Sequence, residues 1–193
     1  MMRIITGTAR GTKLISLEGV ATRPTSERAK EATFSTLAFE IVDKRVLDLF
    51  AGSGQLALEA LSRGACHATL VDNSAAAIDV IRKNVEKTHM QNRATVLRSD
   101  CLTYLQRVGK EKKFDLIFID PPFAEHMVSD MLQIILEKGL ASSHAIFVCE
   151  SEEDDIFEGH ENLRIQFKIR RITRYAKAVV TILERNHDEV LCI

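Results

Sequence analysis

No stretch of this 193-residue chain approaches the roughly 18 uninterrupted apolar residues that a membrane-spanning helix needs. The first residues, MMRIITGTARG, also lack the apolar core of a signal peptide. The four cysteines, Cys66, Cys101, Cys149 and Cys192, form no CxxC motif and no Cys/His cluster at metal-ligand spacing. We therefore expect a cytoplasmic protein with reduced thiols, no membrane partner and no bound metal.

Proline is also scarce, yet two of the three prolines stand side by side at the end of the run FDLIFIDPPF. A proline has no backbone N–H and fixes φ, so two in a row end a central strand and leave a stiff, extended turn. The segment Asp120–Phe123 is therefore expected to be held still at the end of a buried strand.

Neither sign of charge is in large excess, because the formal net charge is −1. This balance argues against a uniformly basic nucleic-acid binder. Basic residues nevertheless gather in the first thirty positions and again between Arg164 and Lys177, whereas acids gather in residues 150–161. The hydrophobic content of 46%, the charged content of 27% and the length fit one globular domain with a full core.

From residue 45 onward, short apolar runs alternate with amphipathic segments. The expected strands are residues 45–50, 68–72, 94–100, 114–120 and 145–151. The expected helices between them are residues 54–64, 74–88, 101–108 and 129–138. This alternation predicts an α/β fold with a parallel sheet and helices on both faces. Residues 163–175 and 176–185 read as two more strands, antiparallel to each other, and the order of the strands stays open.

The N-terminal part has a different pattern. Residues 3–7 and 12–17 are predicted to be two short strands of a hairpin around the turn ARG. A Thr/Ser cap and apolar residues at helical spacing predict a helix over residues 26–39. We expect residues 1–25 to form a hairpin extension and residues 26–193 to form the main domain.

Four acids mark the ends of the first four expected strands in the main domain, namely Asp48, Asp72, Asp100 and Asp120. In an open sheet of this type, ligands bind outside the carboxyl ends of the strands. Several acids at one edge suit a polar ligand that carries hydroxyl groups. The four acids are therefore candidates for a ligand site.

The loop LDLFAGSGQLA contains the pattern Gly52-x-Gly54-x-x-Ala57 between a strand and a helix. Small residues let a ligand approach the backbone, and Asp72 can accept hydrogen bonds from ribose hydroxyls. NAD and S-adenosylmethionine both have such hydroxyls, so the loop does not choose between them. Asp100 and Cys101 are compatible with a purine site, although Asp100 is also a natural helix cap.

The DPPF segment suggests a reaction. The exocyclic amine of a nucleobase is a poor nucleophile, because its lone pair is delocalised into the ring. Two acceptors that hold both amine hydrogens favour a pyramidal nitrogen and disperse the charge that forms, which is electrostatic preorganisation. The Asp120 carboxylate and the Pro121 carbonyl are candidates, and Phe123 offers a ring for stacking. A plain strand terminator is the alternative interpretation.

Several segments together resemble the RsmD family, bacterial guanine-N2 methyltransferases of small-subunit ribosomal RNA. They are RIITGTARGTKL, TRPTSERAKEATFSTL, LDLFAGSGQLALEALSRGA, VDNSAAAI and IDPPF. The resemblance implies a Rossmann-like methyltransferase fold with a seven-stranded, mostly parallel sheet, S-adenosylmethionine as cofactor, and a 30S particle or its RNA as partner. We also expect a monomer.

The resemblance assigns roles by motif. It places the cofactor against Asp48, Phe50, Gly52, Ser53, Gly54, Asp72, Asn73, Asp100 and Cys101. It makes Asp120, Pro121, Pro122 and Phe123 the catalytic segment, and Arg10, Lys13, Arg23, Thr25 and Arg28 the substrate contacts. Two positions depart from the family pattern: Ala57 replaces a loop glycine, and the expected YGxT near the C-terminus reads Tyr175-Ala176-Lys177-Ala178.

Other functions fit parts of this pattern. An adenine-N6 methyltransferase of DNA and a protein glutamine methyltransferase tolerate a related tetrapeptide. An NAD-dependent dehydrogenase shares the glycine loop but gives no reason for DPPF. A non-catalytic assembly factor that binds rRNA would explain the basic stretches alone.

Overall fold

The sheet at the centre of the protein has seven strands in the order β3-β2-β1-β4-β5-β7-β6. The computed structural model describes residues 2–17, 27–122, 127–152 and 155–186. The strands are β1 (Arg45–Asp48), β2 (His67–Asp72), β3 (Ala94–Arg98), β4 (Phe114–Ile119), β5 (Ala141–Ser151), β6 (Phe167–Tyr175) and β7 (Ala178–Arg185). The helices are α1 (Glu27–Thr36), α2 (Gln55–Ser62), α3 (Ala75–Lys87), α4 (Cys101–Arg107), α5 (Met127–Glu137) and α6 (Glu161–Arg164), with a 3-10 turn at Gln91–Arg93.

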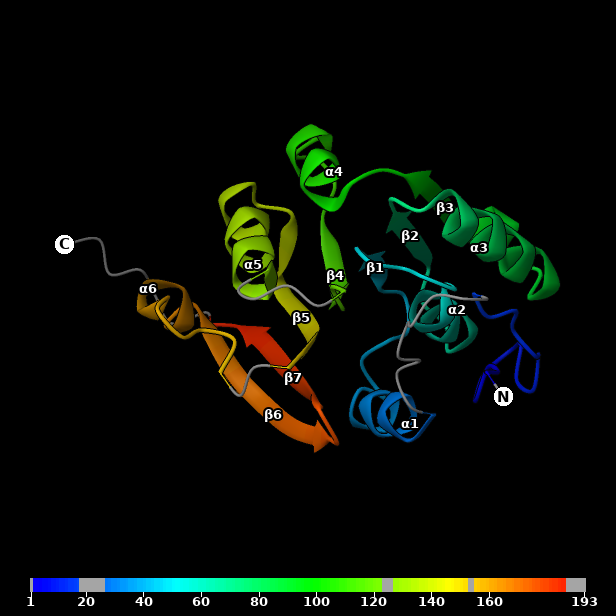
Figure 1. Ribbon diagram of the computed structural model, residues 1–193, viewed down its shortest axis with the longest axis horizontal. Coiled ribbons are helices and arrows are strands. Elements are labelled where there is room, and N and C mark those ends of the chain that lie inside the picture. Colours follow the sequence, from blue (N-terminus) through cyan, green and yellow to red (C-terminus); the bar gives the residue numbers. More distant parts are fainter. Residues whose placement is uncertain (1, 18–26, 123–126, 153–154, 187–193) are drawn as a thin grey trace.

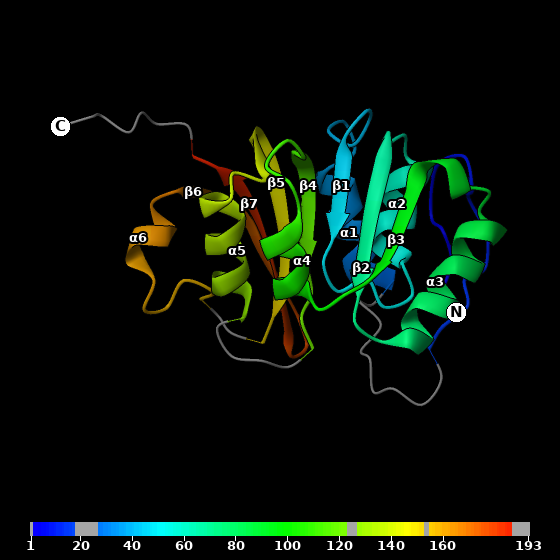
Figure 2. The same ribbon diagram turned by 90° about the horizontal axis from the view of Figure 1, so that it is seen from above.

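Strands β1 to β5 pair in parallel, and β7 pairs antiparallel with both β5 and β6. The predicted mostly parallel sheet is therefore confirmed. The chain first builds outward from β1 to β3 and then returns to place β4 on the other side of β1, as Figure 2 shows. This reversal of strand order puts the carboxyl ends of β1 and β4 side by side, which is where ligands bind in such sheets.

Helices cover both faces of the sheet, as predicted (Figure 1). One core lies between the sheet and α1, α2 and α3, and it also includes Ile4 and Leu14 of the N-terminal segment. The second core lies between the opposite face and α4, α5 and α6. Within the described ranges, no helix is long and apolar enough to cross a membrane.

Three predicted elements of the main domain differ from the structure by three or more residues at one end. Helix α1 ends at Thr36, three residues before the predicted end, and the chain continues in turns such as the one closed by the Glu40 N–H and the Leu37 carbonyl (2.9 Å). Strand β5 begins four residues earlier than predicted, at Ala141, where it pairs with Phe114 before a register shift. Residues 163–166, predicted as strand, instead end α6 and lead into β6. Leu163 there is buried against the second core.

The predicted N-terminal hairpin is present, but its two arms form no regular strands. Its two arms meet at one bridge, Arg3 with Lys13, and at hydrogen bonds such as Ile4 N to Thr12 O (3.0 Å). Four other backbone amides, those of Ile5, Thr6, Ala9 and Ile15, bind side chains of α2 and α3 rather than the facing arm. The predicted two-stranded ladder was therefore wrong in detail, because α2 and α3 provide the partners that a second strand would have provided.

Candidate active site at the carboxyl edge of the sheet

The four acids singled out in the sequence come from four adjacent strands. Asp48 ends β1 and Asp72 ends β2, whereas Asp100 follows β3 by two residues and Asp120 follows β4 directly. In the sheet these strands lie in the order β3-β2-β1-β4. The strand order thus brings four acids that are far apart in the sequence into one row at the carboxyl edge.

The glycine loop is tied to the second acid of this row. The Gly52 N–H donates to Asp72 Oδ2 (2.8 Å), and the Ser74 N–H donates to Asp72 Oδ1 (2.8 Å). The Ala51 N–H donates to the Val71 carbonyl (3.0 Å), which continues the β1–β2 pairing into the loop. Asp72 therefore orders the loop, and because an ionised carboxylate has about four acceptor positions, at least two of them remain for a ligand.

Glycine is favoured at the two loop positions, Gly52 and Gly54, for different physical reasons. Both have positive φ, +55° at Gly52 and +79° at Gly54. A Cβ at Gly54 would lie 3.1 Å from the Leu70 side chain, so Gly54 is needed for close packing where α2 begins. A Cβ at Gly52 would meet nothing within 4 Å. The backbone at Gly52 therefore faces open space, through which a ligand can approach it.

Asp48 lies behind this loop and is 1% exposed. Its Oδ2 has no hydrogen-bond partner among the described residues. Burial, and to a smaller extent the neighbouring Asp72, raise the pKa of Asp48 to about 7, although the backbone amides of Ala57 and Phe50 work in the opposite direction. The site thus contains a buried carboxyl whose charge is not balanced by any described group.

The remaining predicted cofactor residues border the same edge. The Asp100 carboxylate caps α4 by accepting from the Thr103 N–H (3.0 Å), as the sequence predicted. Cys101 is buried in the first turn of α4, and burial raises the pKa of its thiol. The Asn73 carbonyl accepts from Arg98 Nε (3.3 Å), and Phe50 is half-buried against the second core.

The DPPF segment begins where β4 ends beside β1. Asp48 is in register with Phe118, and the Leu49 N–H donates to the Phe118 carbonyl (3.2 Å). Asp120 and Pro121 are half-buried and Pro122 is exposed. Phe123 lies outside the described residues. The structure therefore brings Asp120 and Pro121 to the strand end next to Asp48.

The predicted RNA contacts are more widely spread. Arg10 and Lys13 are exposed on the hairpin, and Arg28 is exposed on α1. The Thr8 N–H donates to the carbonyl of Ser62, the last residue of α2, at 2.8 Å. Arg10 therefore lies near the end of α2 that is about 12 Å from the glycine loop, at 1.5 Å per residue. Arg23 and Thr25 lie outside the described residues.

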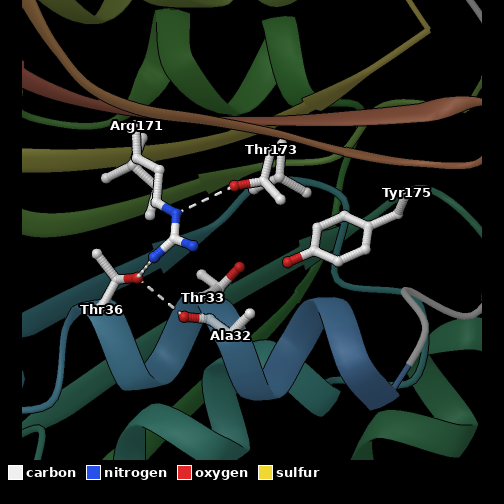
Figure 3. Close-up of a pocket in the computed structure, with 8 residues that line it drawn as sticks. Ala32, Thr33, Thr36, Arg171, Thr173 and Tyr175 are labelled. Carbon is white, nitrogen blue, oxygen red and sulfur yellow. Dashed lines mark hydrogen bonds between the residues drawn. The ribbon is translucent and has the colours of Figure 1, made fainter.

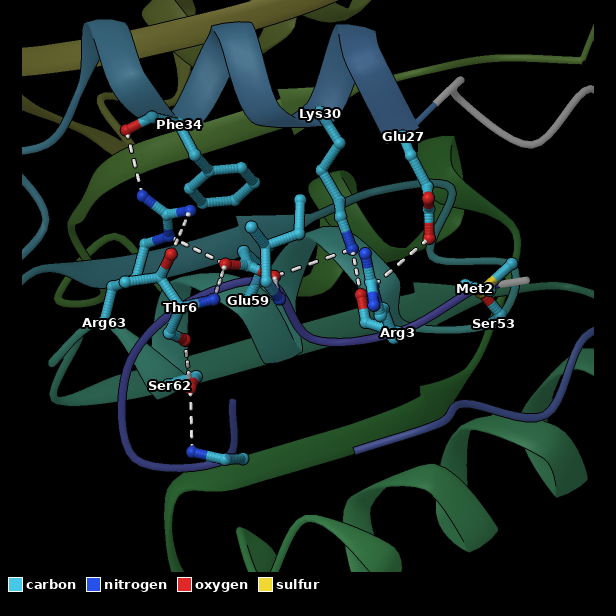
Figure 4. A network of polar contacts seen from close by, with 12 residues as sticks. Met2, Arg3, Thr6, Glu27, Lys30, Phe34, Ser53, Glu59, Ser62 and Arg63 are labelled. Atoms are coloured by element: carbon cyan, nitrogen blue, oxygen red, sulfur yellow. Dashed lines mark hydrogen bonds and ion pairs between the residues drawn. The ribbon is translucent and has the colours of Figure 1, made fainter. Parts of the chain in front are cut away.

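A buried polar network that the sequence did not single out fastens the hairpin to α2 (Figure 4). Glu59 on α2 is fully buried and accepts from the Ile5 N–H (2.7 Å) and the Thr6 N–H (3.0 Å). It also pairs with Arg63 (2.8 Å) and with the buried Lys30 of α1 (3.5 Å). The only sequence signal for this network was one acid inside the apolar run LALEAL.

A second buried residue links the hairpin to the glycine loop. Asn84 on α3 is fully buried and its amide donates to the Ser53 carbonyl and to the Ile15 carbonyl, both at 2.9 Å. Its Oδ1 accepts from the Ile15 N–H (2.8 Å). At the other end of the hairpin, the Ser53 hydroxyl donates to the Met2 sulfur (3.1 Å). Met2 thus contacts the glycine-loop residue Ser53 directly, and Ile15 is linked to Ser53 through Asn84.

Comparisons with known proteins cover almost the whole chain. The sequence model of the family described as "Conserved hypothetical protein 95" matches residues 2–187. A protein of Escherichia coli (strain K12) named "Ribosomal RNA small subunit methyltransferase D" is 36% identical over 154 residues, which are 80% of this chain and 76% of that protein. Its namesake from Haemophilus influenzae is 33% identical and covers 79% of this chain and 80% of that protein.

Solved structures give the same picture. The structure titled "Putative methyltransferase yhhF from Escherichia coli" is 33% identical, with a TM-score of 0.84, and it covers 95% of this chain and 97% of that chain. The shared fold therefore extends over nearly the whole chain. Among the described residues, no group of three or more His, Cys, Asp and Glu side chains is placed to hold a metal ion.

Proposed function

This chain belongs to the family described as "Conserved hypothetical protein 95", the RsmD family, and on this premise we propose that it methylates small-subunit ribosomal RNA. The proposed reaction moves a methyl group from S-adenosylmethionine to the exocyclic N2 amine of a guanine. The proposed substrate is an assembling 30S particle, and the proposed active form is a monomer. The observation that carries the proposal is the similarity, over most of both chains, to proteins named as small-subunit ribosomal RNA methyltransferases.

The residues at the carboxyl edge fit the cofactor. Open space over Gly52 leaves room for a ligand against the backbone, and Asp72 keeps acceptor positions for ribose hydroxyls. The buried and unpartnered Oδ2 of Asp48 fits a cationic group such as the α-amino group of the methionine moiety. Asp100, Cys101, Asn73 and Phe50 border the space proposed for the base and sugar. When bound, S-adenosylmethionine supplies a methyl group on a positively charged sulfur.

In the proposed chemistry, the chain acts mainly by holding the acceptor amine. The Asp120 carboxylate and the Pro121 carbonyl accept hydrogen bonds from the guanine amine and aim its lone pair at the methyl carbon. The N–C bond forms as the C–S bond breaks, and the sulfur keeps the electron pair of that bond. The amine proton then leaves to solvent or to Asp120. Stacking on Phe123 offsets the cost of unstacking the base.

The alternatives are less well supported. A dehydrogenase would use the glycine loop and Asp72 but would leave Asp120 and the two prolines without a role. Adenine or glutamine methylation would use the same tetrapeptide, but the similar proteins over most of the chain are named for ribosomal RNA. A non-catalytic assembly factor would not need acceptors at the end of β4.

The direct test is methyl transfer from labelled cofactor to 30S particles and to naked rRNA, followed by mapping of the modified base. We expect transfer to a guanine N2. Asp120→Ala should lower kcat by about a hundredfold or more, because the amine loses one of two fixed acceptors. Its dissociation constant for S-adenosylhomocysteine should change less than about threefold.

The matched control is Asp130→Ala, which removes an exposed acid from α5 and should leave methyl transfer unchanged. Product from neither RNA substrate would reject the proposed function. Wild-type activity in Asp120→Ala would reject the role of Asp120 but not the function.

A further inference from the structure

Two consecutive arginines on β6, Arg170 and Arg171, have very different surroundings in the structure. The register of β6 against β7 shifts between Ile169 and Arg171, so Arg170 is the extra residue of a bulge. Arg170 makes a bidentate pair with Glu40, with N–O distances of 2.7 and 2.9 Å. Its charge is therefore compensated, and its role is to tie β6 to the chain that follows α1.

Arg171 instead lies against α1 and binds only neutral groups (Figure 3). Its Nε donates to the Thr173 hydroxyl (3.1 Å) and its Nη1 donates to the Thr36 hydroxyl (3.0 Å). No carboxylate lies within ion-pair distance of it in the part of the chain that the structure describes. A guanidinium has five N–H donors, so several donors and the whole charge remain for another partner.

Arg171 stands at a shallow crevice between α1 and the β6–β7 pair, lined by Ala32, Thr33, Thr36, Arg171, Thr173, Tyr175, Val180 and Ile182. We call it the α1–β6 crevice. Three threonines and the tyrosine contribute hydroxyls to it, and Figure 3 shows the Tyr175 side chain reaching across toward α1. Such a lining offers the guanidinium of Arg171 to an anion and contains no negative charge.

The crevice continues toward Arg28, one of the predicted RNA contacts. Residues four apart lie on one stripe of a helix, so Arg28 precedes Ala32 and Thr36 on the stripe that lines the crevice. Arg28 is exposed and lies two turns, about 12 Å, from Thr36 along α1. The acids Glu27 and Glu31 belong to the neighbouring stripe, and Glu27 pairs with Arg3 at 3.8 Å. One exposed arginine thus stands toward each end of a row of hydroxyls.

The crevice also lies at a useful distance from the proposed reaction centre. Arg171 pairs with Ile182, which pairs with Val148, which pairs with Phe118, two residues before Asp120. Three strand spacings separate β6 from β4, which is about 14 Å. A strand of RNA whose base enters the carboxyl edge of the sheet can therefore extend over the β6–β7 turn to this crevice.

We propose that the α1–β6 crevice is a phosphate-binding track for the RNA that flanks the target guanine, with Arg171 as its principal contact. The inference rests on the proposed function, because it takes RNA as the partner. The ligand class is the phosphodiester backbone, because the one charged residue of the lining is a guanidinium with unused donors and no lining residue is an acid. Arg170 is excluded from this role by its pair with Glu40.

The test uses Arg171→Gln with Arg170→Gln as a control. Both variants remove one positive charge from neighbouring positions of the same strand, but only Arg171 has an uncompensated charge. Binding of a 16S rRNA fragment is measured over a series of salt concentrations. For Arg171→Gln, the slope of log affinity against log salt should fall in magnitude by about 0.7, the value for one phosphate contact on a single strand. Arg170→Gln should keep the wild-type slope.

Methyl transfer gives the second readout. Arg171→Gln should raise KM for the RNA about three- to tenfold at low salt with kcat unchanged, because the contact is the same in the ground and transition states. Its affinity for S-adenosylhomocysteine should equal that of the wild type, which shows that the fold is intact. An unchanged slope, or equal losses in both variants, would overturn the inference. Binding is measurable without turnover, so lack of methyl transfer by the wild type would count against the proposed function only.

Discussion

At the scale of single residues, the titration of Asp48 bears on stability between pH 4 and pH 7. Its pKa is raised to about 7 in the folded protein, against an ordinary value of 3.8, mainly by burial. Between pH 4 and pH 7 the folded protein therefore holds a proton that the unfolded chain has released. Linkage then makes the free energy of unfolding fall as pH rises through this window.

We expect Asp48→Asn to remove this dependence. In the wild type, the loss from pH 4 to above pH 7 should be of the order of 4 kcal/mol, at 1.36 kcal/mol for each pKa unit. Urea unfolding of both proteins at several pH values gives the difference between them, in which the other titrating groups cancel. If the two proteins lose stability in parallel between pH 4 and pH 7, Asp48 is not a buried acid that folding protonates.

At the scale of elements, Glu59 joins three segments that are far apart in the sequence, namely α2, α1 and the hairpin. Removing one member of a buried ion pair leaves an uncompensated charge, which costs about 3–5 kcal/mol. Glu59→Gln keeps the shape of the side chain but leaves Lys30 and Arg63 without a carboxylate. We expect a loss of this size in the free energy of unfolding, measured by urea denaturation.

A matched control exists on the surface. Asp155 and Arg164 pair at 2.6 Å, but both side chains are more than two-fifths exposed, at 45% and 43%. Exposed pairs contribute about 0–1 kcal/mol, so Asp155→Asn should cost little. Equal losses of unfolding free energy in Glu59→Gln and Asp155→Asn would show that burial does not increase the contribution of the Glu59 network to stability.

The elements themselves show how far the sequence could predict this fold. Period-two and helical patterns are local, so they located β1 to β5 and the helices between them to within a few residues. The strand order is set by contacts between distant segments, and no local pattern contains it. The partners of Glu59 and Asn84 could not be predicted for the same reason. The hydrogen-bond partners of a buried polar residue can be identified only when the segment that packs against it is known. The prediction for residues 163–166 was wrong because a period-two strand and a short helical turn both place Leu163 in the core.

At the scale of the whole molecule, the hairpin packs into the same hydrophobic core as the main domain. Ile4 is fully buried and Leu14 is 7% exposed, and both belong to the core beneath α1, α2 and α3. The hairpin also satisfies polar groups of Glu59, Ser62 and Asn84. A segment with these contacts should unfold together with the sheet rather than before it.

Deletion of residues 2–17 tests this cooperativity. The truncated protein loses two buried aliphatic side chains at about 2–5 kcal/mol each and leaves three buried polar residues without partners. Because whole domains are stable by only about 5–15 kcal/mol, we expect little or no cooperative thermal transition to remain. Calorimetry of the full chain should give one transition, with equal calorimetric and van't Hoff enthalpies. A truncated protein that keeps the wild-type melting temperature would instead show that the hairpin is an independent extension, free to bind RNA without affecting the body that carries the glycine loop.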